Sequence, residues 1–214
     1  MLRYEIYPVT PFAQNCTLLW DEHSKEAVLI DAGGEPERLG AAIRKHGLLL
    51  KALWLTHGHL DHVGAVGQLA REYGVPVIGP HHEDTFWLDA LPMQAQMFRF
   101  ATPEPIVVQQ WLAGGDELTL GAYRFEVRFT PGHTPGHVVI YSPDLQLVWV
   151  GDVLFAGSIG RTDFPMGNHA QLIDSIHREL FSLPDHTQFI SGHGPMSTIG
   201  QEKLTNPFVA GRAG

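Results

Sequence analysis

The sequence has a single cysteine, Cys16, in 214 residues. One cysteine cannot form an internal disulfide, and such sparse use of cysteine suits a reducing compartment. Long hydrophobic runs are also missing, because no apolar stretch approaches the roughly 20 residues that a membrane-spanning helix needs. Residues 1–5 are not followed by the apolar region of a secretory signal peptide. We therefore expect a cytoplasmic protein with no membrane partner.

Basic residues are scarce as well. The chain has 14 lysines and arginines against 23 aspartates and glutamates, a formal net charge of -9. Nucleic acids attract clusters of basic side chains, and no such cluster occurs here, so we expect no nucleic-acid partner. Apolar residues make up 44% of the chain, enough for a substantial core. The length, without repeats or linkers, predicts a single domain over residues 1–214.

Hydrophobic periodicity predicts an α/β (α+β) protein, because strand patterns alternate with helical ones in the first half of the chain. The segment 80–105 is ambiguous. Its large apolar side chains could line a substrate cleft, but core packing is the preferred interpretation for Trp87, Met93, Met97, Phe98 and Phe100. Residues 201–214 show no strong pattern. The expected strands are 2–9, 16–20, 27–30, 52–55, 75–79, 117–120, 123–129, 138–141, 145–150 and 188–190, and the expected helices are 35–46, 63–73 and 171–181.

The densest group of chemically active side chains is the segment Thr56–His62, which reads THGHLDH and directly follows the apolar run 52–55. On a strand, His62 would face away from the other ligand-type residues, and a regular helix would bring together only residues three or four apart. A turn at the end of the strand can direct all of them into one cavity, and Gly58 allows a tight backbone there. We therefore interpret the segment as a metal-binding loop rather than a histidine-rich surface loop.

Three more candidate ligands follow strand patterns, each beside glycine: His133, Asp152 and His193. Together with the first segment they make five histidines and two aspartates, too many for one tetrahedral zinc but suitable for two ions. Imidazole and carboxylate suit zinc, iron or manganese. In this hypothesis His57, His59 and His133 bind one ion, Asp61, His62 and His193 bind the other, and Asp152 bridges them.

The series T-H-G-H-x-D-H, P-G-H, G-D and G-H-G-P resembles the metal motifs of the metallo-β-lactamase superfamily. The resemblance extends from Asp31 to His193, and the ligand assignment above matches the family position by position. It implies a four-layer αβ/βα sandwich with the metals between the edges of two sheets. Asp31 would support the metal-binding loop from behind the ligands. His137 opens a strand near the site and could act likewise, although a structural histidine is the simpler interpretation.

The segments 131–137 and 160–165 resemble the glyoxalase II and persulfide dioxygenase branches, most specifically the short bacterial glyoxalase II-like proteins of the YcbL type. This resemblance implies hydrolysis of glutathione thioesters, such as S-lactoylglutathione to glutathione and lactate. A hydroxide bridging two divalent ions, with zinc the first expectation, would be the nucleophile, and Asp61 and Asp152 would be catalytic. Arg161 would contact glutathione. An interpretation of equal weight is that Arg161 forms an ion pair with Asp163 that holds the loop. The C-terminal glutathione-binding helical domain of longer relatives is not expected.

Three other functions are alternatives to this interpretation. A mononuclear iron persulfide dioxygenase would use His57, His133 and Asp152 as a facial site with open positions for oxygen. A nucleic-acid phosphodiesterase is disfavoured by the acidic charge. A zinc-stabilised binding module is disfavoured because every ligand position is filled. The sequence leaves metal identity, oligomeric state and the preferred acyl group open.

Overall fold

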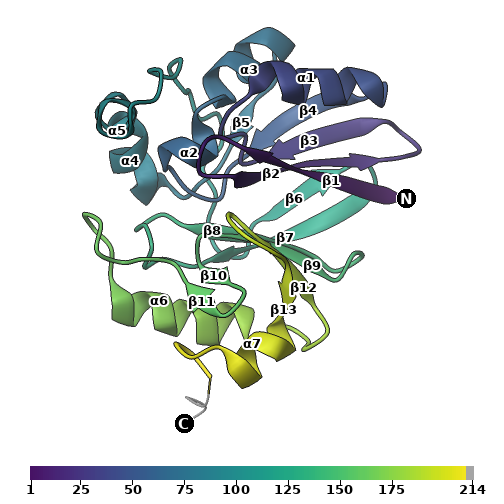
Figure 1. Cartoon of the computed structure of the whole chain (residues 1–214). Helices are drawn as coiled ribbons and strands as arrows, with labels where there is room; N and C mark the ends of the chain where they lie inside the picture. The colour runs from purple at the N-terminus through teal and green to yellow at the C-terminus, as the bar shows by residue number, and fades with distance from the viewer. Residues whose placement is uncertain (211–214) are drawn as a thin grey trace.

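The computed structural model describes residues 1–210, and its helices and strands form four layers (Figure 1). From top to bottom in Figure 1 these are helices, a five-stranded sheet, a six-stranded sheet and helices again. The predicted αβ/βα sandwich is therefore confirmed. None of the helices formed by residues 1–210 combines the length and the apolar character that a membrane span requires.

The first sheet has the strand order β1-β2-β3-β4-β5, in which β1 to β3 are antiparallel and β3 to β5 are parallel. Neighbouring parallel strands need a crossover connection. Helix α1 (Pro36–Lys45) lies in the connection from β3 to β4, and α3 (Val66–Tyr73) lies in the connection from β4 to β5. The strands are β1 (Leu2–Val9), β2 (Gln14–Asp21), β3 (Glu26–Ile30), β4 (Leu49–Trp54) and β5 (Val77–Ile78).

The helix expected over 63–73 is two helices, and the first begins earlier than predicted. Helix α2 spans Leu60–Val63, and α3 follows it after a break at Gly64 and Ala65. The Ala65 N–H donates to the Ala32 carbonyl at 3.0 Å, and a side chain at Gly64 would overlap the Gly33 carbonyl. The break exists because the backbone here packs against the loop after β3, a contact that helical spacing does not encode.

The ambiguous segment folds as η1 (His82–Asp84), α4 (Thr85–Asp89) and α5 (Leu91–Phe98). The preference for core packing was wrong for Met93, Met97 and Phe98, which are 54%, 66% and 39% exposed, whereas Trp87 is buried and also lines a cleft. Helix α5 turns its other face, with Leu91 and Ala95, toward the core. Phe100 packs at the edge of that core.

The second sheet has the order β13-β12-β9-β8-β7-β6, with β12 parallel to β9 and the remaining pairs antiparallel. A separate hairpin joins β10 (Leu154–Phe155) to β11 (Ser158–Ile159). The strands of the sheet are β6 (Glu117–Leu120), β7 (Tyr123–Phe129), β8 (Val138–Ser142), β9 (Leu147–Gly151), β12 (Gln188–Ser191) and β13 (Ser197–Thr198).

The outer helices of this sheet depart from the sequence expectation in two ways. Helix α6 (His169–Ser175) passes into a wider π-helical segment, η2 (Ile176–Leu180), where one longer helix was expected. Helix α7 (Ile199–Thr205) was not expected, because Ile199 and Glu202 are its only buried residues and make no apolar period. Residues 211–214 of that segment lie outside the described residues.

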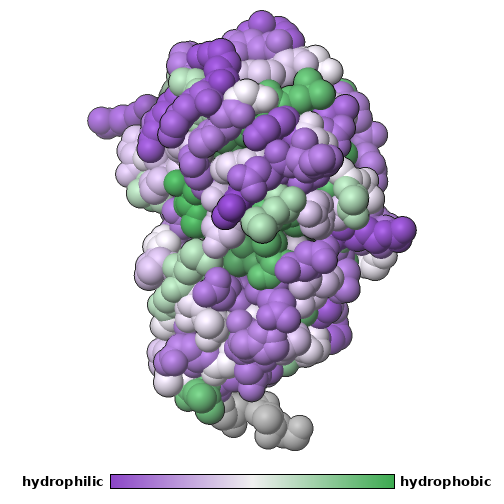
Figure 2. Space-filling model, turned by 90° about the vertical axis from the view of Figure 1, so that its right-hand side faces the viewer, coloured by the Kyte–Doolittle hydropathy of each residue, from purple (hydrophilic) through white to green (hydrophobic). Residues whose placement is uncertain are grey.

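Three hydrophobic cores hold the layers together. The outer cores lie between each sheet and its helices, and the middle core, which includes Trp54 and Phe125, lies between the sheets. Cys16 is fully buried in the first core, as expected of a small core residue. On the face drawn in Figure 2, hydrophobic residues gather at mid-height, the level at which the sheets meet in Figure 1. The single-domain expectation stays a prediction, supported by this shared middle core.

Candidate metal centre

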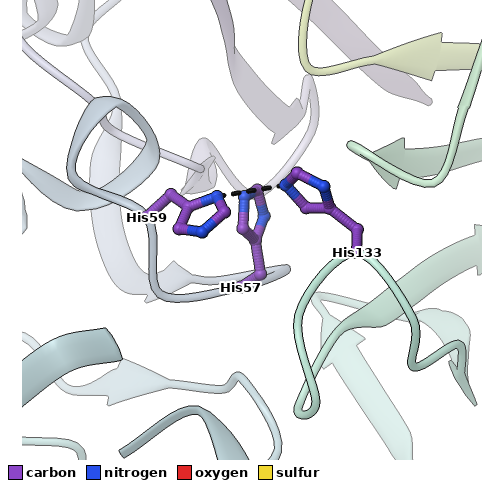
Figure 3. A group of neighbouring side chains, drawn as sticks. All are labelled: His57, His59 and His133. Atoms are coloured by element: carbon purple, nitrogen blue, oxygen red, sulfur yellow. Dashed lines mark hydrogen bonds between the residues drawn. The ribbon is translucent and has the colours of Figure 1, made fainter. Parts of the chain in front are cut away.

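Segments at the ends of strands from both sheets bring the first group of histidines together. His57 and His59 follow β4 of the first sheet, whereas His133 lies between β7 and β8 of the second sheet. One ring nitrogen from each lies within 4.8 Å of the others (Figure 3). Nδ1 of His59 and Nε2 of His133 are 3.0 Å apart. This is the trio that the sequence predicted for the first ion.

A second group lies beside the first. Asp61, His62 and His193 each offer a ligand atom within the same 4.8 Å limit. Oδ2 of Asp61 lies 3.1 Å from Nε2 of His193 and 3.8 Å from Nε2 of His62. Asp61 and His62 belong to the first turn of α2 rather than to a loop, which corrects the sequence prediction of their local structure.

The carboxylate of Asp152 lies between the two groups. Its Oδ1 is 3.3 Å from Nε2 of His62, and its Oδ2 is 3.6 Å from Nε2 of His133 and 3.7 Å from Nε2 of His193. Gly192 must be glycine here, because a side chain would overlap the Asp152 carboxylate and the His62 ring. The structure therefore brings all seven predicted ligands to one place.

Several ligand-type atoms in this cluster lack a well-formed hydrogen bond within the protein. Nε2 of His57 and of His59 is buried without a hydrogen bond from residues 1–210, and the 3.3 Å contact between Nε2 of His62 and Oδ1 of Asp152 does not meet hydrogen-bond geometry. Buried polar atoms are rarely left unpaired because each costs desolvation free energy. Imidazole nitrogens with carboxylate oxygens and no thiolate fit zinc, iron or manganese. The donor set thus fits divalent cations.

Burial favours the neutral form of some histidines in the cluster, whereas nearby carboxylates favour the protonated form of others. Burial lowers the pKa of His57 well below its usual range and that of His59 to about 3, so both rings are neutral, the form that binds metals. Burial opposes ionisation of Asp152, but His62 and the neighbouring histidines outweigh it and lower its pKa. Burial opposes protonation of His62 and His193, yet Asp152 and Asp61 raise both pKa values. Metal binding would displace those protons.

Backbone carbonyls and a carboxylate orient the ligand rings. Nδ1 of His133 donates to the Arg161 carbonyl at 2.7 Å, and Nδ1 of His193 donates to the Phe12 carbonyl at 3.1 Å. A carbonyl can only accept, so these contacts place the proton on Nδ1 and leave Nε2 free for the site. Asp31 lies 2.9 Å from Nδ1 of His62 and orients that ring in the same way.

Asp31 lies behind the ligands, at the place that the family resemblance implies. Its carboxylate accepts hydrogen bonds from the Thr56 N–H at 2.8 Å and the Thr56 hydroxyl at 2.6 Å. Its backbone adopts a φ of 54°, a left-handed conformation that costs a non-glycine residue roughly 1–2 kcal/mol. That strain is maintained because the surrounding hydrogen bonds hold the carboxylate at the base of the metal-binding segment.

His137 is a buried neighbour of the cluster. Its ring stacks on His57, with centroids 4.6 Å apart, and its Nε2 accepts a hydrogen bond from the Asp152 N–H at 3.1 Å. Burial lowers its pKa well below the usual range. His137 is therefore a buried histidine whose ring holds the backbone of the ligand-bearing residue Asp152.

Sequence reasoning missed Asp84 and Gln94. Asp84 is fully buried, and its carboxylate accepts from the Gly58 and Gly136 N–H groups at 2.8 and 2.6 Å. Burial raises its pKa to about 6. Gln94 accepts from the Leu60 N–H at 2.9 Å. Asp84 lies in a polar stretch of the kind found on protein surfaces. Neither Asp84 nor Gln94 belongs to a motif or periodic pattern that would have indicated a role at the site.

A cleft of about 590 Å³ opens over the cluster. Arg161 lines it, and the guanidinium donates two hydrogen bonds of 2.7 Å to Asp163, so the predicted ion pair is present. The guanidinium also lies over the Phe164 ring, 4.0 Å from its centroid. The wall and floor residues of the cleft include Phe12, His59, Asp61, Trp87, Met93, Met97, Phe98, His133, Asp152, Phe155, Ile159, Phe164 and His193.

Comparisons with known proteins agree with this geometry. A family model described as "Metallo-beta-lactamase superfamily" matches residues 9–193. The hydroxyacylglutathione hydrolase GloC of Haemophilus influenzae is 47% identical over 209 residues, which cover 97% of this chain and 98% of that protein. The crystal structure of BLEG-1 B3 metallo-beta-lactamase superposes with a TM-score of 0.90 at 37% identity, covering 98% and 100% of the two chains. TTHA1623 in a di-iron-bound form gives 0.87 at 39% identity, covering 96% and 100%.

Proposed function

Because the chain belongs to the metallo-beta-lactamase superfamily, whose members bind divalent metals, we propose that it is a binuclear hydrolase of glutathione thioesters. S-lactoylglutathione is the first substrate to consider, since the GloC relative is named a hydroxyacylglutathione hydrolase and matches along nearly both chains. The products would be glutathione and lactate. The broader description, a metallo-hydrolase of this superfamily, does not depend on that choice of substrate.

The observation that carries the proposal is the pair of ligand groups joined by Asp152 at the base of one cleft. We propose two ions, with zinc the first expectation. The first would be held by His57, His59 and His133, the second by Asp61, His62 and His193, and Asp152 would contact both.

Bound divalent ions would lower the pKa of a water and polarise the thioester carbonyl. The chain's own residues do the rest. Asp152 supplies negative charge between the two groups, and the Asp61 carboxylate, held by His193, can accept a hydrogen bond from the attacking water. Trp87 and Phe164 place aromatic edges beside His59, 4.4 and 5.4 Å between centroids, and exclude water from that side. A thiolate leaves readily, so no strong general acid is needed.

The test is to measure the metals of the purified protein and to assay the same sample with S-lactoylglutathione. Two ions per chain together with turnover would support the proposal, and chelation should abolish the turnover reversibly. Asp61→Ala should keep the far-ultraviolet circular dichroism spectrum and lose most of kcat. One iron per chain with oxygen uptake on glutathione persulfide, and no thioester turnover, would replace the proposal with the dioxygenase alternative.

A further inference from the structure

Apolar side chains form both walls of the cleft. One wall comes from α5 and the turn after β1, where Met93 and Met97 lie one helical turn apart and the Phe12 ring packs edge-on against Phe98, 5.6 Å between centroids. The opposite wall comes from the β10–β11 hairpin and the segment that follows it, with Phe155, Ile159 and Phe164.

The side chains of the first wall are exposed although they are apolar. Met97 is 66% exposed, Met93 54% and Phe12 45%, and all three belong to the same wall. Exposed apolar side chains that gather at one cleft mark a surface that binds an apolar group. Methionine suits such a surface because its unbranched side chain adapts to ligands of different shape.

Two polar side chains of the walls already have partners in the protein. Gln94 accepts from the Leu60 N–H and donates to the Trp87 carbonyl, so both ends of its amide are paired. Arg161 is the only lysine or arginine that lines the cleft within residues 1–210, and both of its short hydrogen bonds go to Asp163. Away from Arg161 the walls are mainly apolar, so they suit an apolar chain better than a polar peptide.

The apolar surface begins directly at the candidate ligands. The rings of Trp87 and Phe164 are in edge contact with His59. A thioester carbonyl placed over the ligand groups has two substituents, the acyl chain and the thiol. The apolar part of the glutathionyl thiol ends after one methylene, and charged and amide groups follow. The acyl chain is therefore the substituent that gains from the walls.

This inference rests on the proposed thioesterase function. We infer that the walls bind the acyl group of the substrate. The protein should therefore prefer thioesters with longer apolar acyl chains to the lactoyl thioester. Each methylene that leaves water for such a surface should raise kcat/KM about fourfold until the walls are filled. The glutathionyl part would then extend toward the mouth and Arg161.

The experiment compares the acetyl, lactoyl, butanoyl and hexanoyl thioesters of glutathione with the metal-loaded full-length protein. We expect kcat/KM to rise along the acyl series and to be at least tenfold higher for hexanoyl than for lactoyl. A second readout uses S-methyl- and S-hexylglutathione, thioethers that cannot be hydrolysed. Calorimetry should find the hexyl thioether bound at least tenfold more tightly.

Two matched variants locate the effect. Met97→Gln keeps the size of an exposed side chain but makes it polar, and should reduce the hexanoyl-to-acetyl ratio at least threefold. Leu204→Gln makes the same kind of change on α7, outside the cleft and 81% exposed, and should leave the ratio as in the parent.

The outcomes separate this inference from the proposed function. Equal or better turnover of the lactoyl thioester, with equal binding of both thioethers, would overturn the acyl preference and leave the thioesterase function intact. Failure to hydrolyse any thioester with two ions bound would overturn the function. Tight binding of the hexyl thioether that Met97→Gln does not weaken would place the alkyl chain elsewhere and overturn the inference.

Discussion

Asp84 accepts a buried hydrogen bond of 2.9 Å from the Thr134 hydroxyl, although the two residues follow strands of different sheets. The same carboxylate accepts the N–H groups of Gly58, between His57 and His59, and of Gly136. One carboxylate therefore connects the backbone that carries two candidate ligands to the loop that carries a third, across the junction of the two halves.

The first prediction follows from this connection. Asp84→Ala would leave two backbone N–H groups and a hydroxyl without a buried acceptor, each costing roughly 1–3 kcal/mol. We expect the free energy of unfolding, measured with urea, to fall by about 3 kcal/mol or more. Asp89→Ala on the neighbouring helix removes an exposed carboxylate and is the matched control. An equal, small change in both variants would contradict the role given to Asp84.

A second prediction concerns the pH dependence of the same residue. Burial raises the pKa of Asp84 from 3.8 to about 6, so the folded state holds its proton more tightly than the unfolded state does. The stability that this proton contributes is complete below pH 4 and is lost as pH rises through 6, about 3 kcal/mol in total.

Carbon-13 NMR of the metal-free protein should find one aspartate carboxyl that titrates near pH 6. Urea unfolding from pH 4 to 7 should show a decline that Asp84→Asn reduces, because the variant has no carboxyl to ionise. The other titrating groups remain in both proteins and cancel in the difference. An Asp84 that titrates near 4 would refute the prediction.

Asp152→Asn should impair metal binding more than folding. The substitution keeps the shape of the side chain but removes the negative charge that faces His62, His133 and His193. We expect fewer than two ions per chain, or at least tenfold weaker binding of one of them, measured by competition with a chelating dye. Asp144→Asn, in the exposed turn before β9, is the control. Two ions held with unchanged affinity would argue against a bridging carboxylate.

Arg161→Gln tests the contact proposed for glutathione. The side chain is 58% exposed and paired with Asp163, which is 67% exposed, so its loss should change stability by less than about 1 kcal/mol. If the guanidinium holds the glutathionyl part equally in the ground and transition states, KM should rise several-fold with kcat unchanged. Arg124→Gln removes a comparable exposed ion pair on β7, outside the cleft. Kinetics identical to the control would leave Arg161 only the ion pair with Asp163.

The sequence predicted a residue's role well where that role depends on a single strand, helix or loop. His57 and His59 were recognisable because ligand chemistry, glycine and the end of a strand coincide in one short segment, and Asp31 was recognisable from the family motif. Met93 and Met97 were misjudged because an apolar side chain on a short helix has the same pattern whether it faces a core or a cleft. Helix α7 was missed because its single buried apolar residue makes no periodic signal.

The sequence by itself determined most strands of the two sheets, the helix over 36–45 and the kinds of metal ligand, since all of these depend on neighbours a few residues apart. Only the tertiary structure decided that Asp84 is buried between two ligand-bearing segments and that Met97 lines the cleft. Burial and partnership depend on which distant surface packs against an element. For Asp84 that partner, Thr134, lies in the opposite half of the fold.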